Sequence, residues 1–323
     1  MSSNFKIEVY LDPSNRVSCL GQDVIDGLGS YPKKLSPKWF YDENGSQLFE
    51  QITTLPEYYQ TRAETEILTK HTIDISKLEL ETLIELGSGN SEKTKLLLDT
   101  LSKTKSFIKF VPFDVSEQTL RLSAKAIVEK YQDLEVVGIV GDFENHLDRL
   151  EPQGKTLIAF LGGTLGNLLP DQRQIFFQRL YKLLNQKDLI LLGVDLVKSI
   201  QRLIDAYNDA KGITAEFNLN VLNVLNKELQ ANFDLSSFEH VAIWNKEQEW
   251  IEMRLRSRRD QNVYIKDLDL MVPFFQGEEI LTEISAKFTK EKLAQELEPM
   301  GFGISNWWTD QNQDFAVLII EKI

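Results

Sequence analysis

The stretch LIELGSGNSEKTKLLL, residues 83–98, joins a short apolar run to a glycine turn and then to a helical pattern. An apolar run followed at once by Gly87 and Gly89 is typical of a buried parallel strand that turns into a helix. In open α/β sheets, ligands bind beyond the carboxyl ends of the strands, where the first N–H groups of the helices are unpaired. The stretch therefore predicts a strand, a ligand-binding turn at Gly87 and Gly89, and a helix capped by Ser91.

The same alternation of apolar and helical runs continues along much of the chain. The apolar runs are residues 82–87, 106–114, 134–142, 155–163 and 188–196. Helical patterns follow several of these runs, and strands that are apolar throughout are typical of a parallel sheet covered by helices on both faces. The sequence therefore predicts an α/β fold with a doubly wound, Rossmann-like sheet.

The pattern changes after Leu196. A long helical pattern spans residues 197–229, and residues 241–257 alternate apolar and polar side chains around a polar turn, as in an antiparallel hairpin. Residues 278–288 indicate a further strand, whereas the first 60 residues have no place in the α/β alternation. We therefore predict a first domain of residues 61–196 and 287–323, and a second, smaller α+β domain of residues 1–60 and 197–286.

The composition limits the kinds of partner that the chain can take. Its formal net charge of -13 opposes binding to nucleic acid, whose phosphates require clustered lysines and arginines. With one cysteine and three histidines, the chain offers neither an internal disulfide nor a Cys/His zinc cluster, and we expect no metal. No apolar stretch approaches the ~20 residues that cross a bilayer, and the first residues lack the blocks of a signal peptide. We expect a cytoplasmic protein with a small-molecule substrate and no membrane or obligatory protein partner.

The glycine turn does not have the pattern of a phosphate-binding loop. A dinucleotide fingerprint requires a third glycine where this chain has Glu92, whose carboxylate would lie where a pyrophosphate needs space and positive potential. The G-x-x-x-x-G-K-[ST] pattern of nucleoside triphosphatases does not occur in the chain either. These features disfavour an NAD oxidoreductase and favour S-adenosylmethionine, a nucleoside without phosphate.

Acidic residues follow the next two predicted strands. Asp114 ends the second strand, where an acid can accept hydrogen bonds from the ribose hydroxyls. Asp142 ends the third strand and can accept from the adenine amino group, while Phe143 packs on the adenine ring. Lys93, in the helix after the turn, can pair with the methionine carboxylate. Together with Gly87 and Gly89, these residues predict a site for S-adenosylmethionine.

Four longer motifs resemble one known family closely. They are residues 39–64 (WFYDENGSQLFEQITTLPEYYQTRAE), 85–99 (ELGSGNSEKTKLLLD), 160–167 (FLGGTLGN) and 283–288 (EISAKF). Across nearly the whole chain, the sequence is similar to the histidine Nα-methyltransferases of ergothioneine biosynthesis. The resemblance implies a class I methyltransferase domain, a substrate domain, and an activity that trimethylates L-histidine to hercynine.

The resemblance also implies which residues hold the substrate. Tyr58 and Asn167 would meet the α-amino group and act as the catalytic residues. Tyr207 and Asn167 would hold the α-carboxylate, and Tyr41 and Phe49 would lie over the site. Glu283 and Ser285 would bond the two imidazole nitrogens, with Met253 packing beside the ring. For the cofactor, the resemblance implies Tyr41, Gly87, Lys93, Asp114, Asp142, Phe143, Gly162 and Thr164.

Elementary chemistry supports the implied imidazole site. A neutral imidazole presents one N–H and one lone pair, so it needs one acceptor and one donor. Glu283 and Ser285 stand two residues apart on a predicted strand, and therefore point to the same face. Methyl transfer to an amine is an in-line displacement at carbon that needs no metal.

Two alternatives remain open from the sequence alone. The first is an enzyme of the same fold that methylates another amino acid such as tryptophan, which Glu283 disfavours because an indole presents only one ring N–H and no ring acceptor. The second is a silent module that binds S-adenosylmethionine and transfers nothing. The complete set of polar residues implied around the acceptor disfavours this module.

Overall fold

The computed structural model describes residues 5–11, 13–89 and 91–323. Its internal contacts divide the chain into two compact units. The sheet unit comprises Met1–Asp12, Gln60–Leu196 and Phe288–Ile323, and the hairpin unit comprises Pro13–Tyr59 and Val197–Lys287. Except at the start of the chain, these divisions lie at or next to the domain boundaries that the sequence predicts.

The sheet unit is built on an eight-stranded sheet with the order β1-β5-β4-β3-β6-β7-β14-β13. Its parallel centre consists of β3 (Thr82–Leu86), β4 (Lys109–Asp114), β5 (Glu135–Val140), β6 (Thr156–Phe160) and β7 (Leu189–Asp195). β14 (Phe315–Lys322) runs antiparallel to β7, and β13 (Phe302–Thr309) runs antiparallel to β14. The strand order reverses between β3 and β6, so the carboxyl ends of these two strands form the topological switch point. The predicted doubly wound, Rossmann-like sheet is confirmed.

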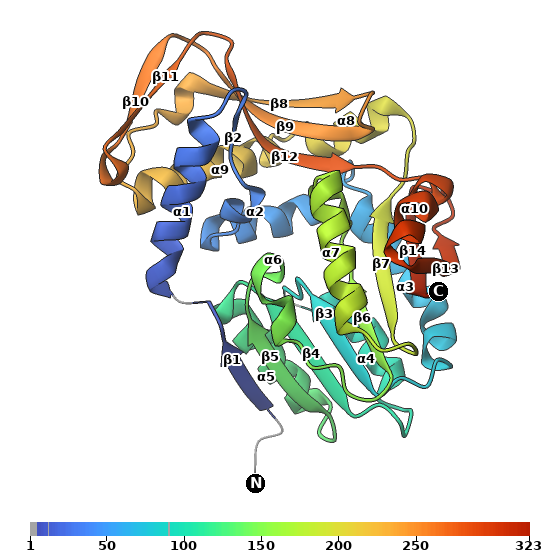
Figure 1. The fold of residues 1–323 in the computed structure, drawn as a ribbon. Helices are drawn as coiled ribbons and strands as arrows, with labels where there is room; N and C mark the ends of the chain where they lie inside the picture. Colours follow the sequence, from blue (N-terminus) through green and yellow to red (C-terminus); the bar gives the residue numbers. More distant parts are fainter. Residues whose placement is uncertain (1–4, 12, 90) are drawn as a thin grey trace. The chain divides into compact units, whose positions relative to one another are not determined.

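Helices cover both faces of this sheet (Figure 1). One face carries α3 (Gln60–Ser76), α4 (Glu92–Leu101) and α5 (Glu117–Lys130), and the other carries α6 (Phe143–His146), α7 (Pro170–Leu183) and α10 (Lys290–Leu297). Leu97 and Ile127 are buried against the strands on the first face, and Phe176 packs on Phe160 on the second. This double cover explains why strands such as β6 and β7 are almost entirely apolar. Among the residues that the structure describes, no helix is long and apolar enough to cross a membrane.

The first strand of the chain also belongs to the sheet. β1 (Phe5–Val9) pairs in parallel with β5 at the edge of the eight-stranded sheet. The prediction that residues 1–60 lie together in the second domain is therefore wrong for this strand. Its sequence, FKIEV, alternates apolar and charged residues, as an edge strand allows, and so differs from the continuous apolar runs on which the α/β prediction rests.

The hairpin unit combines helices with two small sheets. Its helices are α1 (Pro13–Leu28), α2 (Glu43–Thr53), α8 (Ile200–Tyr207) and α9 (Ile213–Glu228). The larger sheet has the order β2-β12-β9-β8, formed by β2 (Lys33–Lys34), β12 (Glu279–Ala286), β9 (Trp250–Ser257) and β8 (Phe238–Asn245). β10 (Gln261–Ile265) and β11 (Leu270–Phe274) form a separate antiparallel pair. The predicted hairpin is the antiparallel pair β8–β9, and the strand predicted at residues 278–288 is β12, which pairs antiparallel with β9.

The long helical pattern of residues 197–229 is divided in two. α8 ends at Tyr207, and α9 begins after Gly212, whose φ of 76° is a left-handed conformation that glycine adopts without strain. The Asp209 carboxylate accepts hydrogen bonds from the backbone N–H groups of Ile213 (3.1 Å) and Thr214 (2.7 Å). These bonds pair the first donors of α9, so the break is a turn with its own cap rather than an irregularity of one helix.

Candidate active site

The glycine turn connects β3 to α4 within the sheet unit. Gly87 and Gly89 have φ angles of 68° and 48°, which are positive and therefore suit glycine. A Cβ added at either position would meet no atom of the described residues within 4 Å, so the space beside the turn is open among them. Ser91 is also left-handed, and its hydroxyl donates to the Ser88 carbonyl (3.5 Å) instead of capping α4. Ser91 is therefore the N-cap residue of α4, as predicted, but its hydroxyl makes no capping hydrogen bond.

Asp114, at the end of β4, fixes this turn in place. Its carboxylate accepts hydrogen bonds from the backbone N–H groups of Gly89 (2.7 Å) and Ser116 (2.8 Å). Burial raises the pKa of Asp114, and the backbone N–H groups of Ser116, Gly89 and Val115 act in the opposite direction. A carboxylate has about four lone-pair sites, so capacity remains for a further donor such as a hydroxyl.

Glu64 is a buried acid that the sequence analysis did not select. It lies in α3, and its carboxylate pairs with the Lys93 ammonium (2.5 Å) and accepts from the backbone N–H of Gly162 (2.7 Å). A Cβ added at Gly193 would come within 2.0 Å of this carboxylate, so the neighbouring strand β7 leaves space for it. Glu64 therefore ties the helix after the glycine turn to the loop after β6. Its helical spacing from the buried Ile67 and Leu68 is the signal that could have identified it.

The loop after β6 carries three of the predicted residues. Gly162 has a φ of 81°, and the Thr164 hydroxyl donates to the Leu161 carbonyl (2.9 Å). Asn167 ends the short helix η3 (Thr164–Asn167), and no described residue forms a hydrogen bond with its side-chain amide. The loop follows β6 at the topological switch point, where ligands of this fold class bind.

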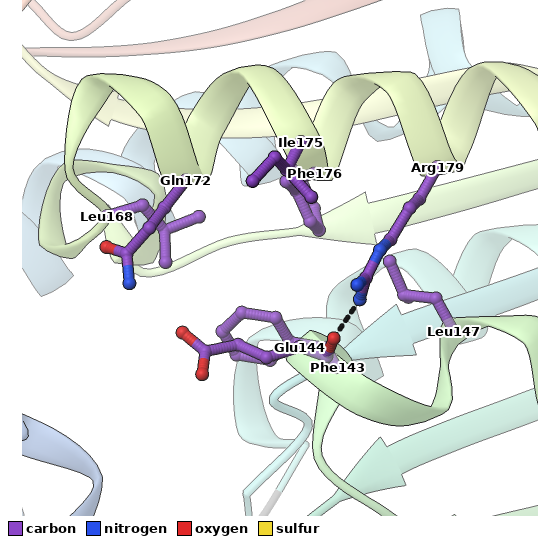
Figure 2. Close-up of a pocket in the computed structure, with 8 residues that line it drawn as sticks. All are labelled: Phe143, Glu144, Leu147, Leu168, Gln172, Ile175, Phe176 and Arg179. Atoms are coloured by element: carbon purple, nitrogen blue, oxygen red, sulfur yellow. Dashed lines mark hydrogen bonds between the residues drawn. The ribbon is translucent and has the colours of Figure 1, made fainter. Parts of the chain in front are cut away.

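Asp142 and Phe143 stand where β5 passes into α6. The Asp142 carboxylate accepts from the Glu144 N–H (2.8 Å) and thereby caps α6. Phe143 lies edge-on to Phe160, with ring centres 5.4 Å apart, and forms one wall of a hollow of about 180 Å³. The hollow is lined by Phe143, Glu144, Leu147, Leu168, Gln172, Ile175, Phe176 and Arg179, and Figure 2 shows Arg179 bonded to the Glu144 carbonyl. An aromatic wall of this kind suits a flat heterocycle.

Four predicted substrate residues lie together in the hairpin unit. Glu283 and Ser285 point to one face of β12 and are buried. Met253 pairs with Glu283 across the strands β9 and β12. The Tyr207 hydroxyl donates to the Ser285 hydroxyl (2.7 Å), so Tyr207 lies beside the residues predicted for the imidazole. Lys287, which the sequence analysis did not select, donates to the same Ser285 hydroxyl (2.7 Å).

The Glu283 carboxylate is buried without a hydrogen-bond donor among the described residues. Burial raises the pKa of Glu283 to about 7, and the positive charge of Lys287 opposes this rise. A buried acceptor without a donor is costly, by about 1–3 kcal/mol. Such a group is expected where a ligand supplies the missing donor.

This raised pKa predicts a pH-dependent stability. Because the pKa lies above the ordinary value of 4.5, the contribution of Glu283 is fully present below pH 4.5 and is lost as the pH rises through about 7. Glu283→Gln should therefore be more stable than the unchanged protein at pH 8, by roughly 1–3 kcal/mol, with a smaller difference at pH 5. Urea denaturation at the two pH values measures this effect.

Glu279→Gln on the same strand is the matched control. The Arg254 and Arg256 guanidinium groups bind the Glu279 carboxylate and hold its pKa below the ordinary value, although burial acts against them. This variant should lose stability at pH 8, in the direction opposite to Glu283→Gln. A Glu283→Gln variant no more stable than the unchanged protein at pH 8 would show that the carboxylate is not destabilised by burial.

Aromatic side chains form a second cluster in the hairpin unit. Phe49 stands edge-on to Tyr41 (5.6 Å between ring centres) and to Tyr58 (6.2 Å). Phe217 of α9 contacts both Tyr41 (5.6 Å) and Phe49 (5.9 Å) and completes the cluster. Phe217 was not predicted, since a phenylalanine on the apolar side of a helix carries no specific signal.

The structure also distinguishes the two adjacent tyrosines of the PEYY motif. The Tyr59 hydroxyl accepts a hydrogen bond from Lys198 (2.6 Å), and Lys198 and Arg202 lie over the Tyr59 ring at 4.3 and 4.8 Å. Tyr58, in contrast, packs beside Phe49 in the aromatic cluster. Tyr58 is therefore the tyrosine grouped with the predicted substrate residues.

Each unit thus brings together its own share of the predicted residues. The sheet unit holds Gly87, Gly89, Lys93, Asp114, Asp142, Phe143, Gly162, Thr164 and Asn167, and the hairpin unit holds Tyr41, Phe49, Tyr58, Tyr207, Met253, Glu283 and Ser285. The first set follows the carboxyl ends of β3, β4, β5 and β6. A Rossmann-like sheet with an open glycine turn and an acid after each of the next two strands defines a class I, S-adenosylmethionine-dependent methyltransferase.

Comparison with known proteins gives the particular family. Residues 20–322 match the family described as histidine-specific, S-adenosylmethionine-dependent methyltransferases, and the chain belongs to that family. It is 48% identical to a histidine N-alpha-methyltransferase of Mycolicibacterium smegmatis, over 95% of this chain and 96% of that protein. It is likewise 48% identical to a protein of the same name from Mycobacterium tuberculosis, over 94% of this chain and 95% of that protein. It is 30% identical to ergothioneine biosynthesis protein 1 of Schizosaccharomyces pombe, over 87% of this chain and 38% of that protein.

The resemblance inferred from the sequence motifs is therefore confirmed. The protein is an enzyme that uses S-adenosylmethionine as its methyl donor and histidine as its acceptor. The residues present fit S-adenosylmethionine, because the glycine turn borders open space and the Asp114 carboxylate keeps capacity for a further donor such as a ribose hydroxyl. The roles of the individual residues remain predictions.

Glu64 leads to a prediction about cofactor affinity. Glu64→Ala would remove the buried carboxylate that pairs with the Gly162 N–H and the Lys93 ammonium, at a cost of about 1–3 kcal/mol for hydrogen bonds to a charged group. We expect S-adenosylmethionine to bind about 5- to 100-fold more weakly, as measured by titration calorimetry. Glu66→Ala is the control, because the Glu66 carboxylate lies on the same helix and accepts from Gln311 instead (3.0 Å). Equal dissociation constants for the two variants would show that Glu64 does not contribute to the binding of S-adenosylmethionine.

Proposed function

We propose that this protein transfers three methyl groups in succession from S-adenosylmethionine to the α-amino nitrogen of L-histidine, and releases hercynine for ergothioneine biosynthesis. The observation that carries the proposal is the buried pair of Glu283 and Ser285 on one face of β12. Glu283 is an acceptor that lacks a donor, and Ser285 is a hydroxyl two residues away. A neutral imidazole has the complementary groups, one N–H and one lone pair. The names of the relatives support the choice of the α nitrogen and of the pathway.

The proposed cofactor site uses the residues that follow the parallel strands. Asp114 would accept from the ribose hydroxyls, Asp142 from the adenine amino group, and Phe143 would pack on the base. Lys93 would neutralise the methionine carboxylate while Glu64 keeps the ammonium in position. The cofactor supplies a methyl carbon made electrophilic by the positive sulfur to which it is attached.

The proposed chemistry is an in-line displacement by the amine nitrogen. The amine must be deprotonated, so that its lone pair forms the new N–C bond while the S–C electron pair returns to sulfur. We assign Tyr58 and Asn167 to orient this lone pair, with the proton leaving to water or through Tyr58. Positioning of this kind can lower a barrier by ~7–11 kcal/mol. After three transfers no N–H remains on the nitrogen, so the reaction stops at the quaternary product.

The aromatic cluster suits the change of charge during these rounds. Tyr41, Phe49, Tyr58 and Phe217 present aromatic rings in the unit that also carries the imidazole residues. Each suitable ring face stabilises a quaternary ammonium group by about 0.5–2 kcal/mol. The cluster therefore favours a methylated amine at this place over an uncharged apolar group.

Tyr58→Phe tests the assigned role of the hydroxyl. We expect kcat to fall by about 10- to 100-fold, because the amine loses a group that orients it or carries away its proton, while the affinity for S-adenosylmethionine stays the same. Tyr59→Phe is the matched control, since the Tyr59 hydroxyl bonds to Lys198. Steady-state kinetics with histidine measure both variants. If Tyr59→Phe is the slower of the two, the assignment to Tyr58 is wrong.

The proposed function is tested with an unbiased mixture of substrates. The protein is incubated with S-adenosylmethionine and all the common amino acids, and the products are identified by mass spectrometry. We expect histidine alone to gain up to three methyl groups. Methylated tryptophan in place of histidine would favour the alternative acceptor, and the absence of any methylated amino acid would overturn the proposal.

A further inference from the structure

Ser285, Tyr207 and Lys287 form a buried triangle of hydrogen bonds in the hairpin unit. Lys287 donates to the hydroxyl oxygens of Ser285 (2.7 Å) and Tyr207 (3.0 Å), and the Tyr207 hydroxyl donates to Ser285 (2.7 Å). The Lys287 ammonium also lies 4.7 Å from the centre of the Tyr207 ring. All three residues are at least nine-tenths buried, with Lys287 only 3% exposed.

The chemistry of the three groups fixes the direction of these bonds. An ammonium group has only donors, so Lys287 must donate to both hydroxyls. A phenol is a better proton donor than an aliphatic alcohol, so the remaining bond runs from Tyr207 to Ser285. The single Tyr207 proton is then not available to the substrate α-carboxylate, the role that the family resemblance implies for Tyr207. Ser285 then receives two hydrogen bonds, which occupy both lone pairs of its oxygen. The only hydrogen-bonding capacity that remains to Ser285 is its own O–H.

We propose that Lys287 is a positioning residue that, together with Tyr207, makes Ser285 an obligatory donor to the lone pair of the substrate imidazole. The inference rests on the proposed function, because it concerns how that site reads histidine. The residues 283, 285 and 287 alternate along one chain segment, so the acceptor, the donor and the residue that orients the donor lie on one face.

The consequence is a site that accepts one form of the ring. Glu283 is an acceptor and takes the ring N–H, whereas Ser285 donates and therefore requires an unprotonated nitrogen. An imidazolium ion presents two N–H groups and would leave Ser285 without an acceptor. An indole presents one N–H and no lone pair, and leaves the same donor unpaired. Lys287 thus contributes to the preference for histidine without touching the ring.

A double-mutant cycle tests whether Lys287 acts through Ser285. Ser285→Ala and Lys287→Met are each expected to raise KM for histidine by about 10-fold, as one lost hydrogen bond in a buried site does, with kcat changed less than KM. The double variant should show about the same 10-fold rise, because Lys287 has nothing left to orient. Lys287→Arg keeps the positive charge and the hydrogen-bond donors, so its KM for histidine should stay near that of the unchanged protein.

Several results would overturn the inference. A double variant whose KM rises by about 100-fold means that the two effects are independent, as they would be if the ammonium bound the substrate carboxylate itself. If Lys287→Met binds S-adenosylmethionine more weakly and Ser285→Ala does not, Lys287 is needed for the general integrity of the fold. Either outcome removes Lys287 from the recognition of the ring.

A second measurement needs no variant and applies even if Lys287→Met fails to fold. Histidine labelled with ¹⁵N in its ring is bound to the unchanged protein with S-adenosylhomocysteine, and its ring nitrogens are observed by NMR. We expect one protonated and one unprotonated nitrogen, and a bound imidazolium would contradict the inference. If the unchanged protein methylates histidine but the effects of the two substitutions on KM are independent, the inference about Lys287 is wrong and the proposed function stands. If the unchanged protein does not methylate histidine, the proposed function itself fails.

Discussion

Glu283→Leu is expected to lower kcat/KM for histidine by about 100- to 1,000-fold. The ring N–H would then enter a buried site that has no acceptor, and a lost hydrogen bond to a charged group costs about 1.5–3 kcal/mol before the unpaired donor is counted. The carboxylate is the natural partner because no described residue donates to it and burial raises its pKa to about 7. Most of the loss should appear in KM, since the interaction is made with both substrate and transition state.

The test compares this variant with Glu279→Leu under the same conditions. Glu279 lies on the same strand, but Arg254 and Arg256 occupy its carboxylate. We expect the control to keep most of its activity toward histidine, and both variants to bind S-adenosylmethionine as the unchanged protein does. A Glu283→Leu variant with the kcat/KM of the control would mean that this carboxylate does not meet the imidazole.

Asp114→Ala is expected to weaken S-adenosylmethionine binding by about 100-fold or more. The substitution removes the acceptor of the Gly89 and Ser116 N–H groups and, in the proposed site, the acceptor of the ribose hydroxyls. Each such loss costs about 1–3 kcal/mol, and about 1.4 kcal/mol corresponds to a tenfold change in affinity. The glycine turn would also lose its attachment to β4, so the cofactor would bind a less ordered loop.

Ser116→Ala is the matched control for this variant. It removes the hydroxyl that accepts from Thr119 (3.4 Å) at the start of α5, and leaves the Asp114 carboxylate and the Ser116 N–H in place. Titration calorimetry should give nearly unchanged binding for Ser116→Ala. A dissociation constant for Asp114→Ala equal to that of the control would exclude Asp114 from the cofactor site.

The sequence predicts the centre of the sheet well because burial on both faces leaves a strong pattern. Strands such as β6 and β7 have buried residues at every position, so their sequences are almost entirely apolar. β1 does not, because an edge strand with partly exposed residues keeps polar side chains. The division between α8 and α9 was missed because the turn at Asp209 and Gly212 occupies only a few residues inside a long helical pattern.

The candidate site was predictable where a residue follows directly from the end of a strand or from a family motif. Asp114 and Asp142 belong to this group. Glu64 and Lys287 do not, because their partners are distant in the chain: Glu64 is 98 residues from Gly162, and Lys287 is 80 residues from Tyr207. Contacts of this kind are decided by the folded structure, and the local pattern around each residue does not contain them.

In the proposed reaction, methyl groups pass from S-adenosylmethionine to the backbone nitrogen of histidine. The most direct test combines S-adenosylmethionine labelled with ¹³C in its methyl group and histidine labelled with ¹⁵N at the α position, and observes the product by NMR. We predict a product in which three equivalent ¹³C methyl groups are coupled to the labelled α nitrogen. Labelled carbon on a ring nitrogen, or labelled carbon that never couples to the α nitrogen, would contradict the claim.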